Sequence, residues 1–177
     1  HVRRAEQAFL LAAEVRDDDG PPRGALGEAA GERQDGGGAA RVVVRAVPDF
    51  RAAVWVERAG VVKVWKPDTK STVVAGKLAT FTGLEDGALG ITLDPGFAQN
   101  HWIYVNRSLP ETTTNSQGKV GIIRVARFTV KGDQLDLATE TPIIDVETQR
   151  EQCCHVGGSL TFDAAGNLYM SIGDNTN

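Results

Sequence analysis

Short apolar runs separated by turn residues fill the chain from about residue 52 onward. The runs are AAVWVER, VVKVWK, STVVAG, ALGITLD, HWIYVNRS, GIIRVARFTV, TPIIDVE, GGSLTF and NLYMSIGD. They are rich in Val, Ile, Tyr, Trp and Thr, which favour strands, and none is long enough for a typical helix. The pattern predicts an all-β antiparallel protein with strands of about five to eight residues.

Residues 1–48 have a different pattern. The stretch EVRDDDGPPRGALGEAAGERQDGGGAAR has almost no large apolar side chain, so it cannot bury enough surface to offset the entropy lost on ordering. RRAEQAFLLAAEVR, which overlaps its start, has helical spacing and good helix formers. We therefore predict a low-complexity Ala/Gly/Arg-rich segment over residues 1–48, disordered except for one short helix. A single β domain follows over residues 52–177.

An imperfect repeat links two parts of the β region. LDPGFAQNHWIYVNRS and FDAAGNLYMSIGDN each contain an apolar residue, an Asp, a turn and then a Tyr between aliphatic residues. VPDFRAAVWVERAG is a weaker third copy, and Tyr104 and Tyr169 lie 65 residues apart. Repeats of roughly 40 to 50 residues with four strands each are typical of β-propellers. A β-sandwich is the alternative fold.

Composition narrows the function classes. The 177 residues are 41% hydrophobic and 24% charged, with a net charge of −4, as in globular proteins that do not bind nucleic acid. No apolar run approaches the roughly 20 residues that span a bilayer. The chain starts at His1 and stops directly after a strand-like run, so we expect it to be a piece of a longer protein.

The last predicted hairpin places His155 and Asp174 at its open end. The DAAG stretch suits a four-residue loop, because Asp opens turns and Gly accepts the left-handed backbone that closes them. If Phe162 faces Asn167 across this loop, the numbers of paired residues add up to 329, which pairs His155 with Asp174. A carboxylate beside an imidazole fixes its tautomer and stabilises the imidazolium. The pair is a candidate general base with its orienting partner; the alternative is two solvated residues at the rim of a sheet.

The two cysteines, Cys153 and Cys154, directly precede His155. A metal site has little support, because there is no second cysteine pair and the three histidines, His1, His101 and His155, lack ligand spacing. Free buried thiols and a disulfide between the adjacent cysteines both stay open. Such a disulfide would stiffen the loop that carries His155.

Other polar residues stand close to strand ends. Glu85 and Asp86 lie in a Gly-flanked turn just before an apolar strand, where loop-borne functional carboxylates often occur, although solvated turn acids are the commoner case. Asn106 and Arg107 end the WIYVNRS strand and are expected at the same end of the sheets as His155.

Several of these stretches together carry a family resemblance. GLEDGALGITLDPGF, WIYVNRS, RVARFTV, LDLATETPIIDV and CCHVGGSLTFDAAGNLYMSIGDNTN are similar to the glucose/sorbosone dehydrogenase family. These are soluble quinoprotein sugar dehydrogenases that use pyrroloquinoline quinone (PQQ). The likeness covers residues 55–177 and is most specific around residues 83–97 and in the final 25 residues.

The resemblance implies a six-bladed β-propeller, of which this chain supplies about two to three blades, with PQQ and calcium bound on top. His155 matches the base that takes the proton of the sugar hydroxyl while hydride passes to the quinone, and Asp174 matches its paired carboxylate. Glu85 falls where the family has a polar residue near the cofactor, commonly Gln. Gly157 and Gly158 would let the backbone pass close to a flat ligand.

The resemblance also implies partners and a location. A sugar substrate and an electron acceptor are expected, in a periplasmic or secreted protein. The basic residues that clamp the cofactor and the groups that bind calcium lie in the family beyond the end of this chain, so residues 1–177 alone are expected to be inactive. A non-catalytic propeller that binds carbohydrate or protein is the alternative function.

Overall fold

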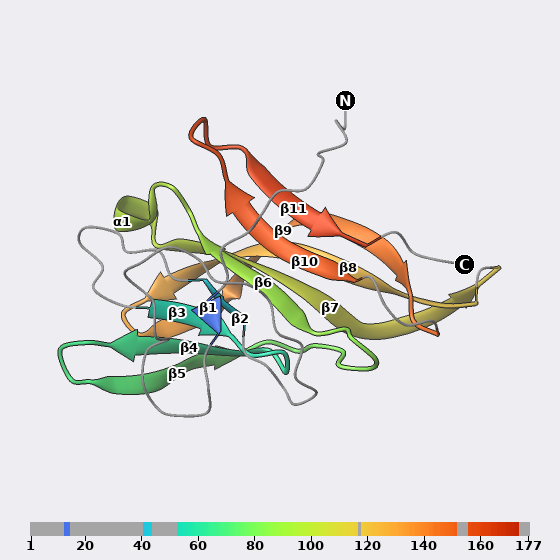
Figure 1. Cartoon of the computed structure of the whole chain (residues 1–177), viewed down its shortest axis with the longest axis horizontal. Coiled ribbons are helices and arrows are strands. Elements are labelled where there is room, and N and C mark those ends of the chain that lie inside the picture. Colours follow the sequence, from blue (N-terminus) through green and yellow to red (C-terminus); the bar gives the residue numbers. More distant parts are fainter. Residues whose placement is uncertain (1–12, 15–40, 44–52, 117, 152–155, 174–177) are drawn as a thin grey trace.

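The computed structural model describes residues 13–14, 41–43, 53–116, 118–151 and 156–173. Strands dominate these residues, and the one helix among them is the four-residue α1, Phe97–Asn100. The all-β prediction is therefore confirmed. The strands form three successive antiparallel sheets, an arrangement typical of propeller blades, and within the described ranges the sheets do not close into a ring (Figure 1).

The first sheet has the strand order β1-β2-β3-β4-β5. Its strands are β1 (Ala13–Glu14), β2 (Arg41–Val43), β3 (Ala53–Val56), β4 (Val61–Lys66) and β5 (Ser71–Lys77). Both β1 and β2 fall in the segment predicted to be irregular or helical. The two described residues of the expected helix are instead a strand, and β2 continues the sheet by pairing with β3.

The second sheet is a four-stranded meander in the order β6-β7-β8-β9. Its strands are β6 (Ala88–Leu93), β7 (Trp102–Asn115), β8 (Gly118–Lys131) and β9 (Gln134–Gln149). The predicted strand length is wrong for the last three, which have 14, 14 and 16 residues. The polar stretch after Ser108 still pairs with β8, because a register shift between Ser108 and Thr112 accommodates Pro110, which cannot donate to the ladder.

The third sheet is the hairpin of β10 (Gly157–Phe162) and β11 (Leu168–Ile172). β10 packs against β6 and β7 of the second sheet, and the first sheet meets the second through β2 and β3 against β6 and β5 against β9. The main core between the first two sheets is apolar and mostly aliphatic, with Val56, Ile91, Ile103 and Phe128 fully buried. A smaller apolar cluster around Leu160 joins the third sheet to the second.

The two hairpins that contain the sequence repeat have the same turn chemistry. In the β6–β7 turn, the carboxylate of Asp94 accepts hydrogen bonds from the Gly96 backbone at 2.8 Å and the Tyr104 hydroxyl at 2.9 Å. In the β10–β11 turn, Asp163 accepts from the Ala165 backbone at 2.9 Å and the Tyr169 hydroxyl at 3.0 Å. The repeat seen in the sequence is thus a structural repeat.

The β10–β11 loop differs from the prediction by one residue. Phe162 pairs with Leu168, and the Asp163 backbone N–H donates to the Asn167 carbonyl at 3.0 Å, so three residues form the loop instead of four. Residue numbers of pairs next to the loop therefore add up to 330. The carboxylate of Asp163 explains the tighter loop, because it also accepts the Asn167 N–H at 2.8 Å and holds that residue opposite itself.

Candidate functional site

Hydrogen bonds from Arg58 hold the loop that carries Glu85 and Asp86. The Arg58 guanidinium donates to the carbonyl of Asp86 through Nε at 2.8 Å and to the carbonyls of Thr82 and Leu84 through Nη2, at 2.8 Å for Thr82. Leu84 has a positive φ of 51°, a strained backbone that these contacts help to hold. The loop is therefore a built feature of the fold, and its carboxylates have defined positions.

Asp86 is a buried carboxylate in a polar cluster. Its Oδ1 accepts a hydrogen bond from Ser108 Oγ at 2.6 Å and lies 3.4 Å from Arg150 Nη1. The side chains of Asp86 and Arg150 are 3% and 1% exposed. Burial raises the pKa of Asp86, against the lowering effect of the Ser108 hydrogen bond and the Arg150 charge. The ion pair is thus shielded from water, and each charge is stabilised there mainly by the opposite charge of its partner.

Arg150 joins three parts of the chain at the end of β9. Its Nη2 donates to the carbonyl of Leu109 at 3.0 Å, its guanidinium stacks 4.1 Å from the Phe81 ring centroid, and its backbone N–H donates to Lys119 at 2.8 Å. Burial lowers the pKa of Arg150, partly offset by Asp86. Arg150 therefore fixes the point where the chain leaves β9 toward residues 151–155.

Glu85 contacts the chain on the other side of those residues. Its Oε1 accepts a hydrogen bond from the backbone N–H of Val156 at 3.3 Å, across 71 positions of sequence. The neighbouring carboxylates Glu85 and Asp86 therefore contact both flanks of residues 151–155. Sequence analysis proposed Glu85 as a residue near the cofactor; in the structure its described partner is the backbone beside His155.

Gly157 and Gly158 have backbone conformations that suit glycine, with φ of 70° and 120°. They lie at the register shift of the β10–β11 hairpin. A Cβ on Gly158 would lie 2.5 Å from Leu89 Cβ, and a Cβ on Gly90 would lie 1.9 Å from the Gly158 carbonyl oxygen. The close approach of β6 and β10 thus requires glycine at these positions for packing, whether or not a ligand also lies there.

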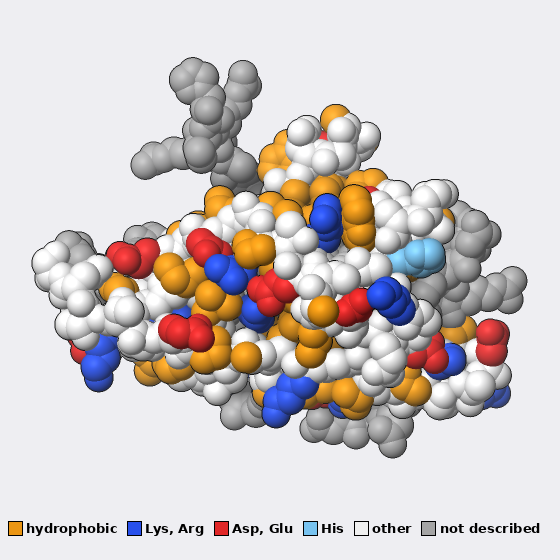
Figure 2. Space-filling view, turned by 180° about the vertical axis from the view of Figure 1, so that it is seen from behind, with side chains coloured by type: hydrophobic (Ala, Val, Ile, Leu, Met, Phe, Trp, Pro, Cys, Tyr) orange, Lys and Arg blue, Asp and Glu red, His pale blue; other side chains and the backbone are white. Residues whose placement is uncertain are grey.

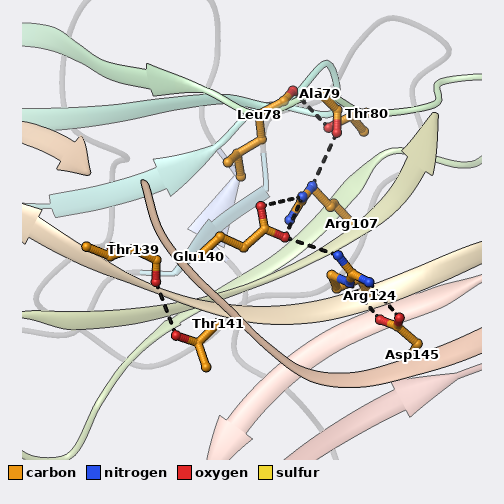
Figure 3. A network of polar contacts seen from close by, with 9 residues as sticks. All are labelled: Leu78, Ala79, Thr80, Arg107, Arg124, Thr139, Glu140, Thr141 and Asp145. Atoms are coloured by element: carbon orange, nitrogen blue, oxygen red, sulfur yellow. Dashed lines mark hydrogen bonds and ion pairs between the residues drawn. The ribbon is translucent and has the colours of Figure 1, made fainter. Parts of the chain in front are cut away.

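Asn106 and Arg107 have different surroundings. The Asn106 side chain is fully buried beside Gly158, and its carboxamide makes no hydrogen bond with any residue that the structure describes. Arg107 donates to Glu140 at 2.8 and 3.0 Å and to the Ala79 carbonyl at 3.2 Å. Figure 3 shows Arg107 within a network that continues through Glu140 to Arg124 and Asp145. Arg107 is therefore engaged in hydrogen bonds within the second sheet and with the segment that follows β5.

Four predicted site residues, Cys153, Cys154, His155 and Asp174, lie outside the described residues. The described ladder ends next to them. Gly157 pairs with Ile172, so the register shift changes the sum of paired numbers from 330 to 329, and the Gly173 N–H donates to the Val156 carbonyl at 3.4 Å.

Neither a metal cluster nor a membrane span is found among the described residues. No group of three or more His, Cys, Asp and Glu side chains there has the proximity that a metal ion needs. No described helix is long and apolar enough to cross a bilayer. Figure 2 shows acidic and basic side chains interspersed over the described surface of one face.

The sequence pattern of the Glucose / Sorbosone dehydrogenase family matches residues 42–177. The chain belongs to this family. The match begins ahead of the predicted domain start at residue 52 and takes in most of β2. The predicted family is thus confirmed.

Solved structures of sugar dehydrogenases have the same fold as this family member. A glucose dehydrogenase-type oxidoreductase from Thermus thermophilus is 24% identical, with a TM-score of 0.60 over 72% of this chain and 35% of its own. The soluble aldose sugar dehydrogenase of Escherichia coli is 22% identical, with a TM-score of 0.60 over 73% and 36%. The PQQ-bound aldose sugar dehydrogenase of Streptomyces coelicolor is 19% identical, with a TM-score of 0.56 over 71% and 36%. The partial β-propeller is confirmed, and the β-sandwich is excluded.

The human Hedgehog-interacting protein is a relative by sequence. It is 31% identical over 99 residues, which are 52% of this chain and 13% of that protein. This glucose/sorbosone dehydrogenase family member therefore spans little more than a third of the similar enzyme structures and a smaller share of the human relative.

Arg58 and Arg150 are the site residues that sequence reasoning missed. Arg58 contacts carbonyls 24 to 28 positions away, and Arg150 pairs with an acid in the loop before β6, so neither forms a local motif. One sequence feature could have indicated Arg150. It stands shortly before the Cys-Cys-His sequence, where a basic residue could have been considered as a partner for Asp86.

Proposed function

We propose that this chain is the N-terminal part of a quinoprotein sugar (aldose) dehydrogenase in which His155 is the general base. The observation that carries the proposal is the register of the β10–β11 hairpin. Its last described pairs have numbers that add up to 329, which is the sum that a His155–Asp174 pair requires. Family membership supports the reaction class, oxidation of a sugar hydroxyl.

The preceding hairpin supports the same register. In β6–β7 a shift between Ala88 and Gly90 is followed by the pair of Ala88 with Arg107 and by a 2.9 Å hydrogen bond from the Ser108 N–H to the Gly87 carbonyl. The β10–β11 hairpin has the equivalent shift and the equivalent terminal hydrogen bond. The first hairpin keeps its register past the shift as far as Gly87 and Ser108, the equivalents of Val156 and Gly173. We propose that the second hairpin continues one pair further, to His155 and Asp174.

The proposed chemistry of this chain is a proton transfer. One imidazole nitrogen of His155 accepts the proton of the sugar hydroxyl, and Asp174 accepts a hydrogen bond from the other nitrogen and stabilises the imidazolium. Together they make the hydroxyl oxygen negative enough to release hydride from its carbon to an acceptor. The family's quinone is the proposed hydride acceptor.

Three arginines close to the Glu85 loop and the sheet ends already have partners within the described residues. PQQ carries carboxylates that need cations, whereas Arg58, Arg107 and Arg150 are already bonded to loop carbonyls, Glu140 and Asp86. In line with the family resemblance, we propose that the clamp for the quinone and the calcium site lie beyond residue 177 and that residues 1–177 alone are inactive. A periplasmic or secreted location, a sugar substrate and an electron acceptor are part of this proposal.

The test replaces the base in the full-length protein reconstituted with PQQ and calcium. His155→Ala should lower dye reduction with an aldose by about 10² to 10⁴, the usual contribution of a positioned base. His101→Ala is the control, because His101 lies after α1 in the β6–β7 turn, where its ring contacts Phe97. Turnover that survives His155→Ala with little loss would remove the general-base assignment.

A non-catalytic binding module is the second candidate function. The identity with the human Hedgehog-interacting protein favours it, because the name of that protein describes protein binding and not catalysis. The two functions differ in quinone binding. Calorimetric titration of the full-length protein with PQQ and calcium should show saturable binding for the enzyme and none for the binding module.

A further inference from the structure

We infer that Glu85 and Asp86 are positioning residues that hold both flanks of residues 151–155 and so fix where His155 stands. Adjacent in sequence, they contact opposite flanks: Asp86 pairs with Arg150, and Glu85 accepts the N–H of Val156. The part of this inference that concerns turnover rests on the proposed function, whereas the anchoring itself does not.

The contact between Asp86 and Arg150, on the first flank of residues 151–155, is rigid. Arg150 and Asp86 are almost completely buried, and Ser108 holds the carboxylate at 2.6 Å. Arg150 also donates to the Leu109 carbonyl and stacks on Phe81, so its guanidinium has little freedom to move. Because three contacts hold the Arg150 side chain, the backbone at the end of β9 has a defined position.

The Glu85 side is a single hydrogen bond to the backbone. Val156 directly follows residues 151–155, and its N–H donates to Glu85 Oε1 at 3.3 Å while its carbonyl accepts from the Gly173 N–H at 3.4 Å. The start of β10 is therefore bonded on one side to the Glu85 loop and on the other to the end of β11. Arg58, which bonds three carbonyls of the Glu85 loop, links this anchor to the first sheet.

This geometry gives Glu85 a role other than direct contact with a cofactor. The anchoring needs an acceptor oxygen at the end of a side chain of this length, and it does not need a negative charge. Glu85→Gln keeps such an oxygen and should preserve the anchor, whereas Glu85→Ala removes it. The pair of variants thus separates an acceptor role from a charge role.

The first measurement is amide hydrogen exchange in the full-length protein without quinone, followed in a peptide that covers residues 151–158. Glu85→Ala should raise the exchange rate of the Val156 amide by about tenfold or more, because a local opening then needs no broken hydrogen bond. Glu85→Gln and the control Glu57→Ala, which removes only a surface ion pair with Lys63, should each change it by less than about twofold. A peptide from β8 reports whether the fold is intact.

The second measurement is steady-state turnover of the same variants with PQQ and calcium. Glu85→Ala should lower kcat by about tenfold or more with KM within about threefold, because a misplaced base weakens the reaction step more than binding. Glu85→Gln should restore most of kcat.

Unchanged exchange in Glu85→Ala would overturn the inference, and so would equal acceleration in Glu85→Ala and Glu85→Gln. A fall in kcat without faster exchange would also overturn it, because Glu85 would then act on the reacting groups directly. If His155→Ala leaves turnover intact, the proposed function fails, while the exchange result still decides whether Glu85 anchors this segment.

Discussion

Asp86 Oδ1 lies 3.4 Å from Arg150 Nη1, and the two side chains are 3% and 1% exposed. The pair connects the loop before β6 with the end of β9. Buried ion pairs add little net stability, because desolvation offsets much of their attraction, but a single charge left alone in such a place is costly. The pair is therefore better explained as a device that selects one arrangement of these two segments than as a source of stability.

Removing one partner should destabilise the fold strongly. We expect Asp86→Ala in the full-length protein to lower the free energy of unfolding by about 3 to 5 kcal/mol, because Arg150 is left buried without a counter-charge. Lys63→Ala breaks a partly exposed ion pair with Glu57 and should cost no more than about 1 kcal/mol. Denaturant unfolding of both variants measures the difference. Equal losses would mean that the Asp86–Arg150 pair is not desolvated in solution.

Glycine at position 158 should be essential for packing. Gly158→Ala introduces a Cβ 2.5 Å from Leu89 Cβ at a φ of 120°, so we expect a loss of roughly 3 kcal/mol or more from clash and backbone strain together. Gly132→Ala is the matched control, since its φ of 59° is also positive but nothing lies within 4 Å of its Cβ. The control should lose only about 1 to 2 kcal/mol, the cost of the left-handed backbone. Thermal unfolding of the two variants separates the cost of the backbone strain from the cost of the clash with Leu89.

The repeat turn at Asp94 predicts a dependence of stability on pH. Burial raises the pKa of Asp94, but hydrogen bonds from Asn100, Gly96 and Tyr104 outweigh it, so the pKa is lowered from 3.8. A carboxyl whose pKa is lower in the folded state stabilises the fold above its unfolded pKa, and this stabilisation is lost as pH falls through the folded value. Stability should therefore fall below about pH 4.

Two variants test this assignment. Asp94→Asn should reduce the slope of melting temperature against pH in the acid range, and Tyr104→Phe should reduce it in part, because Tyr104 donates one of the hydrogen bonds to the carboxylate at 2.9 Å. Slopes equal to that of the unchanged protein in both variants would exclude the turn carboxylate as the source.

The sequence predicted the fold class and most strand positions, because alternating β-branched and apolar residues leave few alternatives to a sheet. It failed where a polar segment continues a strand. Residues 109–115 of β7 are largely exposed, and their pairing with β8 follows from the adjacent ladder and the shift around Pro110, not from their own side chains.

The hairpin prediction illustrates how local geometry determines register. The predicted four-residue loop is wrong by one position, because Asp163 draws Asn167 opposite itself. The shift between Gly157 and Leu160 then compensates, so that the described ladder ends with the predicted sum of 329 at Gly157 and Ile172. Bulges of this kind depend on contacts such as that of Gly158 with Leu89, which join residues far apart in sequence and leave no local pattern.

Asp174 provides the last prediction, on the pH profile of the proposed enzyme. If Asp174 pairs with His155, its negative charge favours the imidazolium and raises the imidazole pKa. Asp174→Asn removes that charge, so the limb of kcat/KM that rises with pH should move to lower pH. At the same time kcat should fall, because the uncharged partner no longer stabilises the imidazolium. Asp163→Asn is the control, because Asp163 lies at the opposite, loop end of the same hairpin. If kcat falls but the rising part of the pH profile of kcat/KM does not shift, Asp174 stabilises the hairpin and does not pair with His155.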